Sequence, residues 1–118
     1  MDLDRLQDEL AAWTQRNFGE QPAWRPLLGA VEELGELAHA YLKREQGIRG
    51  TAEEHRAAIA DAVGDVVVFL ADFCNREGII LGECVRLAWG TARKRDWVAE
   101  RHDAARESEA LTTEGHHG

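Results

Sequence analysis

Residues 51–77 read TAEEHRAAIADAVGDVVVFLADFCNRE, and this stretch decides the fold class. Thr51 is a favourable N-cap, and Glu54 three residues later completes a capping box. The run of valines at 66–68 is by itself typical of a strand. The length of the stretch without Gly-Pro punctuation, and the helical spacing of its acidic residues, favour a helix instead. We therefore predict one helix over residues 51–76.

The rest of the chain is compatible with helix nearly throughout, because its two prolines, Pro22 and Pro26, lie in one short stretch. Apolar residues spaced three and four apart predict further helices over residues 2–17, 26–45 and 81–98. The apolar stripe of the second of these consists of Leu27, Val31, Leu34, Ala38, Tyr41 and Leu42. The fold class expected is all-α, a bundle of about four helices.

The length of 118 residues fits one domain, which we assign to residues 1–98, with a polar and partly disordered tail at 99–118. The formal net charge of −8 argues against nucleic acid or an anionic membrane as partner. The longest apolar run, residues 62–71, is too short to span a bilayer. An acidic N-terminus without a signal peptide, and two cysteines outside any CxxC motif, predict a cytoplasmic protein with reduced thiols.

Acidic residues lie beside the apolar face of the helix over 26–45. At about 100° per residue, Glu33 and Glu36 are within about 60° of each other on the flank of the stripe, and Glu32 lies nearer solvent. Gly29 and Ala40 share the arc of the first two and leave room beside them. An ordinary solvated face is the alternative interpretation.

The next helix carries Glu54, Asp61, Asp65 and Asp72 within about 40° of one line. Asp65 lies in AVGDVVVFLA, which is apolar all round, so we expect it to be buried. A buried carboxylate is costly unless it is paired or bound to a metal. A buried salt bridge and bonds to backbone groups are the alternatives to a metal site.

The two helices together offer a cluster of oxygen ligands: Glu33, Glu36, Asp61 and Asp65. These carboxylates repel one another unless a cation fills the cluster. Oxygen ligands suit Mg²⁺, with Mn²⁺ as a substitute, rather than zinc. Magnesium held in this way recruits phosphate oxygens, so the expected chemistry is attack of water on a phosphoanhydride.

Cations and one tryptophan are candidates for contacts with such a substrate. Lys43 and Arg44 end one predicted helix, and residues 93–95 (RKR) end another. Either group can hold polyphosphate or simply complement the helix dipole. Trp24, in a predicted loop beside Arg25, is the candidate for stacking on a base, with core packing as the alternative.

The string PLLGAVEELGELAHAYLK (26–43), followed by DAVGDVVVFLADFC (61–74), resembles the MazG-like family of all-α nucleoside triphosphate pyrophosphohydrolases. The resemblance covers most of residues 10–97, including the closing KRDW (94–97). The family signature is ExxE on one helix and ExxD on the next. Glu33-Leu34-Gly35-Glu36 matches the first half, and Asp65 matches the final aspartate. Ala62 stands where the second half has glutamate, and Asp61 beside it can substitute on the same face.

This resemblance implies an oligomeric helical bundle that uses Mg²⁺ to cleave an NTP or dNTP to the monophosphate and pyrophosphate. Either Glu33 or Glu32 would orient or deprotonate the water, and Lys94 and Arg95 would contact phosphate, beside the candidates Lys43 and Trp24. The metal ligands would be Glu33, Glu36, Asp61 and Asp65.

We expect a homo-oligomer, either a dimer or a tetramer, because a small bundle with acids inside has little core of its own. Leu3, Leu6 and Leu10 are expected to pack against the partner copy. Two other functions remain open. Glu36-x-x-His39 is the motif of ferritin-like di-iron sites, which need a second copy that the sequence lacks. A non-catalytic helical module is the other, because Ala62 departs from the signature.

Overall fold

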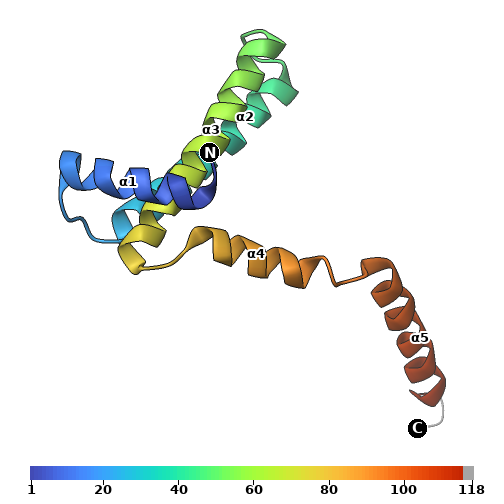
Figure 1. Cartoon of the computed structure of the whole chain (residues 1–118). Helices are drawn as coiled ribbons and strands as arrows, with labels where there is room; N and C mark the ends of the chain where they lie inside the picture. Colours follow the sequence, from blue (N-terminus) through green and yellow to red (C-terminus); the bar gives the residue numbers. More distant parts are fainter. Residues whose placement is uncertain (116–118) are drawn as a thin grey trace. The chain divides into compact units, whose positions relative to one another are not determined.

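The computed structural model describes residues 1–115, with side chains through residue 108. Within this range the chain is all-α and has no strand, as predicted, and it has five helices where about four were expected (Figure 1). The helices are α1 (Leu3–Phe18), α2 (Trp24–Gln46), α3 (Ala52–Glu77), α4 (Leu81–Ala92) and α5 (Trp97–Gly115). No helix in the described range is long and apolar enough to cross a membrane.

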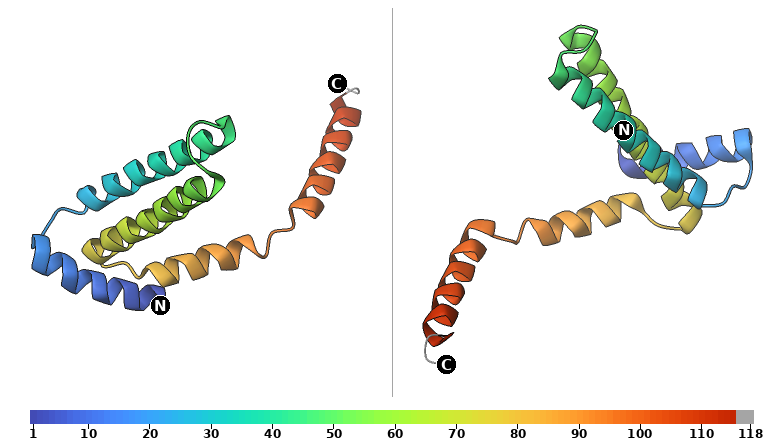
Figure 2. Two further views of the ribbon diagram at one scale, coloured as in Figure 1. Left: turned by 90° about the horizontal axis from the view of Figure 1, so that it is seen from above. Right: turned by 180° about the vertical axis from the view of Figure 1, so that it is seen from behind.

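The chain divides into two compact units, Met1–Cys84 and Val85–Gly118. In the first unit α2 and α3 lie side by side as a helical hairpin, and α1 packs against α3 (Figure 2). The packed helices of this unit therefore number three, and most of α4 belongs to the second unit. The boundary between the two units lies between Cys84 and Val85, and the predicted domain of residues 1–98 stays a prediction.

Local sequence signals set the ends of the hairpin helices. The Oγ1 atom of Thr51 accepts a hydrogen bond of 3.1 Å from the backbone N–H of Glu54, as the capping-box pattern predicts. Gly47 and Gly78 follow α2 and α3 with φ angles of 66° and 69°, which glycine adopts without steric cost. Because residues 47–51 are all that separates α2 from α3, the end of one helix and the start of the next are neighbours.

Small residues let α2 and α3 approach each other closely. A Cβ atom added at Gly29 would lie 2.5 Å from the Phe69 ring, so the ring occupies the space of the missing side chain. Ala30 and Ala62, one on each helix, are buried. The interior of the hairpin is thus narrow, which brings polar side chains on its edges close together.

A partly buried pair of amide side chains, Gln7 and Asn75, links α1 to the C-terminal end of α3. Gln7 donates from Nε2 to Asn75 Oδ1 at 3.0 Å and to the Ile79 carbonyl at 2.9 Å. Asn75 donates from Nδ2 to the Gln7 carbonyl at 2.9 Å, and the Leu81 N–H donates to Gln7 Oε1 at 2.9 Å. Both polar atoms of the Gln7 side chain therefore have hydrogen-bond partners, which offset the cost of burying the amide.

The apolar residues of α1 and α2 face differently from the prediction. Leu10 is buried and Leu3 and Leu6 are half-buried, so these leucines already pack within their own chain. On α2 the least exposed positions recur every three or four residues and include Pro26, Ala30, Glu33, Leu37 and Ala40. The predicted stripe lies on another face and is exposed: Leu27, Val31, Leu34, Ala38, Tyr41 and Leu42.

The second unit corrects the prediction for the C-terminal part of the chain. α4 ends at Ala92 instead of near residue 98, and a separate helix, α5, occupies most of the predicted polar tail. Asp96 Oδ1 accepts hydrogen bonds from the N–H groups of Val98 and Ala99 at 3.1 and 3.0 Å. This N-cap is a start signal that the sequence analysis missed. Residues 116–118 of the predicted tail lie outside the described range.

Candidate metal centre

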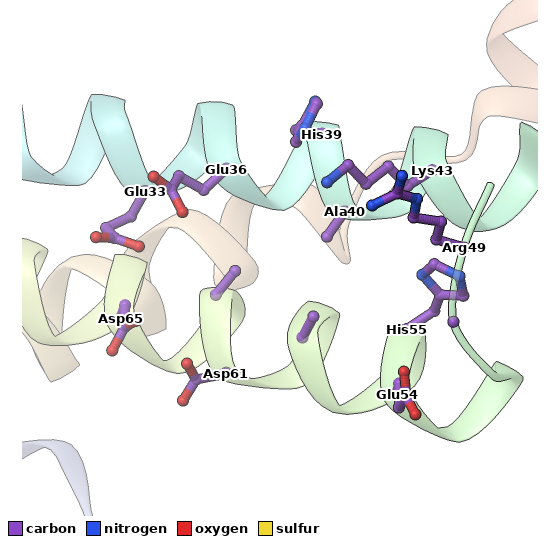
Figure 3. A pocket seen from close by; sticks show the side chains of 13 residues that line it. Glu33, Glu36, His39, Ala40, Lys43, Arg49, Glu54, His55, Asp61 and Asp65 are labelled. Atoms are coloured by element: carbon purple, nitrogen blue, oxygen red, sulfur yellow. The ribbon is translucent and has the colours of Figure 1, made fainter.

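A groove of about 360 Å³ runs between α2 and α3 to the hairpin tip (Figure 3). All four predicted metal ligands line it, Glu33 and Glu36 from α2 and Asp61 and Asp65 from α3. The full lining is Glu33, Glu36, His39, Ala40, Lys43, Arg49, Gly50, Glu54, His55, Ala58, Asp61, Ala62 and Asp65. Side-by-side packing of the hairpin helices thus joins two acid pairs that lie far apart in the sequence.

Asp65 is half-buried rather than buried, so its predicted environment was wrong in degree. The reason is that α3, although α1 and α2 pack against it, keeps part of its surface exposed: Val63 and Val68 are 47% and 40% exposed. Among the described side chains Asp65 has no ion-pair partner. The salt-bridge alternative applies instead to Asp72, whose carboxylate pairs with Arg76 at 2.9 Å.

Glu33 lies where partial burial and the charges of the groove act on one carboxyl group. Its pKa is raised above the ordinary 4.5, first by partial burial and then by the negative charges of Asp65, Glu36, Asp61 and Glu32. Desolvation and like charges both disfavour an ionised carboxylate. Acids from both α2 and α3 therefore act on Glu33.

The donor set of this cluster fits a hard divalent cation, because four carboxylates supply oxygen ligands of the kind that Mg²⁺ and Mn²⁺ prefer. As the side chains stand, no three acidic, histidine or cysteine groups in the described range converge closely enough to hold an ion. Like charges push carboxylates apart, and Glu36 and Asp61 are exposed and able to rotate.

Three further predicted residues lie in the first unit, and one of them lines the groove. Lys43 is part of the lining. Glu32 is exposed and outside it, although its charge contributes to the raised pKa of Glu33. Trp24 is the first residue of α2 rather than a loop residue, and the Arg25 guanidinium lies 5.6 Å from its ring centroid. Trp24 is not part of the groove.

Lys94 and Arg95 belong to the second unit and follow the end of α4. The Arg95 guanidinium lies 4.2 Å from the centroid of the Trp97 ring and pairs with Glu100 at 3.3 Å. Local partners therefore engage Arg95, and its role in phosphate binding stays a prediction.

Sequence analysis missed the residues that line the tip end of the groove, above all Arg49 and His55. His39, which the sequence suggests only as a di-iron ligand, lines the groove as well. The signal was present in the predicted helices themselves. Two helices joined by a break of a few residues must place the end of the first beside the start of the second, and Lys43 and His55 occupy those positions.

Comparison of the chain with protein-family models, with curated proteins and with solved structures finds no match. The groove, its charges and the spacing of its acids are therefore the grounds on which a function is argued.

Proposed function

We propose that the protein is a Mg²⁺-dependent nucleoside triphosphate pyrophosphohydrolase of the MazG-like kind, which cleaves an NTP or dNTP to the monophosphate and pyrophosphate. One observation carries the proposal. The pair Glu33 and Glu36 on α2 lines the same groove as the pair Asp61 and Asp65 on α3 (Figure 3). Lys43 in this groove adds a positive charge suited to phosphate.

The acids of the groove would have two roles in hydrolysis, binding of the cation and activation of the attacking water. Glu36, Asp61 and Asp65, together with Glu33, would hold the cation. When bound, a divalent cation neutralises charge on phosphate oxygens and lowers the pKa of water. Glu33 is better suited than the exposed Glu32 to orient the attacking water and accept its proton, because its pKa is raised and it lies inside the groove.

The departure at position 62 shapes the metal site. Ala62 lines the groove and is 6% exposed, so no carboxylate comes from this position on α3. Asp61 is one residue away and exposed, and positions four apart on a helix share a face, so Asp61 and Asp65 can act together. We propose that Asp61 replaces the glutamate of the family signature.

A screen of canonical and damaged NTPs and dNTPs, with Mg²⁺ or Mn²⁺, tests the proposed function. Products are separated by ion-exchange chromatography, and we expect a nucleoside monophosphate together with pyrophosphate. Release of orthophosphate would identify a phosphatase instead. Glu36→Gln is the control for contamination, because this variant lacks one carboxylate of the site and should show no turnover while keeping its melting temperature.

A second candidate function, a helical interaction module without catalysis, is favoured by one observation, the alanine at position 62. It predicts no turnover of any nucleotide and no change of melting temperature on addition of Mg²⁺ or Mn²⁺. The hydrolase proposal predicts both turnover of a nucleotide and a change of melting temperature on addition of Mg²⁺ or Mn²⁺.

We also propose that the protein works as a homo-oligomer, a dimer or a tetramer. The exposed stripe of α2 supports this, because Val31 and Leu34 are 60% and 56% exposed in the single chain. Contiguous apolar surface of this kind marks an interface in soluble proteins.

A further inference from the structure

The groove between α2 and α3 has two ends of opposite charge (Figure 3). One end of the groove, near the middle of the two helices, is lined by the four acids described above. The other end, at the turn of the hairpin, is lined by Lys43, Arg49 and His55, which we call the basic tip. Glu54 also lines this end, so two full positive charges stand against one negative charge before His55 is counted. A ligand lying along the groove would meet carboxylates at one end and cations at the other.

Two cations of the basic tip, Lys43 and Arg49, have no partner among the side chains that the structure describes. Neither Lys43 nor Arg49 makes a side-chain hydrogen bond, ion pair or ring contact with any described side chain. Their neighbour Arg44, in contrast, pairs with Glu45 at 3.3 Å and lies 5.2 Å from the Tyr41 ring centroid. Figure 3 shows Lys43 and Arg49 extending from the tip back along the groove. They are therefore available to an anion that enters it.

The backbone of the turn places Arg49 over the start of α3. Arg49 has a φ angle of 24°, the one positive value at a non-glycine residue in the described range, and Gly50 follows at 98°. Glycine suits such angles best, yet an arginine occupies the first of them. A Cβ at Gly50 would lie 3.0 Å from Glu54 Oε2 and 3.4 Å from His55 Nε2, so the turn is packed against both side chains.

The separation of the two ends suits a polyphosphate chain. His55 and Asp61 are six positions apart on α3, which is about 9 Å along the helix at 1.5 Å per residue. Glu36 and Lys43 are seven positions apart on α2, which is about 10 Å along the helix. The long flexible stems of Lys43 and Arg49 shorten this span. Phosphates at the acids, through a cation, and phosphates at the tip can thus belong to one extended group.

We propose that the basic tip is a subsite for the terminal phosphates of a nucleoside triphosphate, the part that leaves as pyrophosphate. This inference rests on the proposed function and adds a direction to it. The nucleoside lies on the side of the acids away from the tip, and the tip favours triphosphates over diphosphates. The same subsite binds pyrophosphate as product.

Titration calorimetry with inorganic pyrophosphate in the presence of Mg²⁺ tests the subsite without requiring turnover. The variant is Lys43→Gln/Arg49→Gln, and Arg44→Gln is the matched control, since it removes the same charge outside the groove. Each lost charge-assisted contact should weaken binding about tenfold, so the double variant should bind about a hundredfold more weakly. Arg44→Gln should bind within about twofold of the wild type. Glu54→Gln should bind more tightly, because it removes a like charge.

Several outcomes overturn the subsite: no pyrophosphate binding by the wild type, equal binding by the double variant, or an equal loss in Arg44→Gln. Arg49→Lys, which keeps the charge, should retain most of the affinity and so separates loss of charge from disturbance of the turn. The fate of the proposed function is read separately from nucleotide turnover. A wild type that hydrolyses NTP, and a double variant with unchanged kcat/KM, would leave the function standing and remove the subsite. Tight pyrophosphate binding that depends on the basic tip, without turnover of any nucleotide, would support the subsite and contradict the proposed function.

Discussion

Glu33 is the residue of the groove at which protonation and the proposed metal binding would compete. Its carboxyl is half-buried, and four neighbouring acids raise its pKa together with that burial. The protonated form is therefore more favoured in the folded protein than in the unfolded chain. A cation competes with this proton for the same oxygens, so metal affinity should rise as the pH rises through the pKa of Glu33.

We predict a pH dependence of stability in metal-free buffer that comes from Glu33. Its pKa is raised on folding, so its contribution is fully present below the ordinary value of 4.5 and is lost as the pH rises through the folded value. Thermal unfolding followed between acid and neutral pH should show less loss of melting temperature in Glu33→Gln than in the wild type. Glu20→Gln, which changes an exposed acid outside the groove that does not act on Glu33, is the control. Parallel profiles for wild type and Glu33→Gln would contradict the assignment.

The most discriminating single substitution is Asp65→Asn. Because Asp65 is half-buried among other acids and has no ion-pair partner in the described range, its neutralisation should keep or raise the melting temperature without metal. Hydrolysis should be abolished, since the cation loses a ligand charge. Asp72→Asn is the contrasting variant, because it breaks the pair with Arg76 and should destabilise by about 1–3 kcal/mol.

Loss of melting temperature in metal-free Asp65→Asn would instead assign Asp65 a structural role. Asp61→Asn tests the departure from the family signature in the same assay. Full activity in that variant would show that Asp61 does not replace the glutamate missing at position 62.

At the scale of the elements, helix positions could be predicted well, and helix faces could not. Spacing and caps placed α1, α2 and α3 within about two residues of their ends, because Thr51, Gly47 and Gly78 act locally. The end of α4 and the start of α5 were not predicted. The N-cap Asp96 lies in a polar stretch that has no apolar residues at helical spacing to indicate a helix.

The face of α2 that meets α3 could not be read from its apolar stripe. A hydrophobic period indicates which residues favour leaving water, but not which partner covers them. Within the chain, Gly29 and Ala30 allow the closer approach, and the large residues of the stripe are left exposed. The four acids predicted on α2 and α3 line one groove, and their grouping as a metal site stays a prediction. The lining of the hairpin tip by Arg49 depends on the turn between the two helices, which the helix patterns do not describe.

Gly29 gives a test of this close packing between α2 and α3. Ala in a helix interior is favoured over Gly by about 0.5–1 kcal/mol, but overpacking against Phe69 costs about 1–3 kcal/mol. Gly29→Ala should therefore lower the free energy of unfolding and the melting temperature, by about 5 °C for each kcal/mol lost. Gly35→Ala is the matched control, since a Cβ there meets nothing within 4 Å and should stabilise. A stabilised Gly29→Ala would mean that the helices lie further apart.

At the scale of the whole molecule, the first unit has more apolar surface than its interior uses. Buried apolar positions include Leu10, Ala30, Ala62, Ala71 and Cys74, which are mostly small. The stripe of α2 meanwhile stays in water. The net charge of −8 makes copies of the chain repel one another. At 0.1 M salt this repulsion is largely screened beyond a distance of about 10 Å. Apolar attraction and charge repulsion thus oppose each other in self-association.

We predict that the stripe of α2 holds copies of the chain together, so that light scattering at micromolar concentration shows a dimer or tetramer, favoured by added salt. Val31→Glu places a charge in the middle of the stripe and should weaken association at least about tenfold, because a buried unpaired carboxylate is costly. Ile48→Glu is the control: Ile48 is 46% exposed and lies in the turn, outside the stripe. A monomeric wild type, or equal loss of association in both variants, would show that α2 is not the interface. If Val31→Glu is a folded monomer that still binds Mg²⁺, the metal centre belongs to one chain, as its lining by α2 and α3 requires.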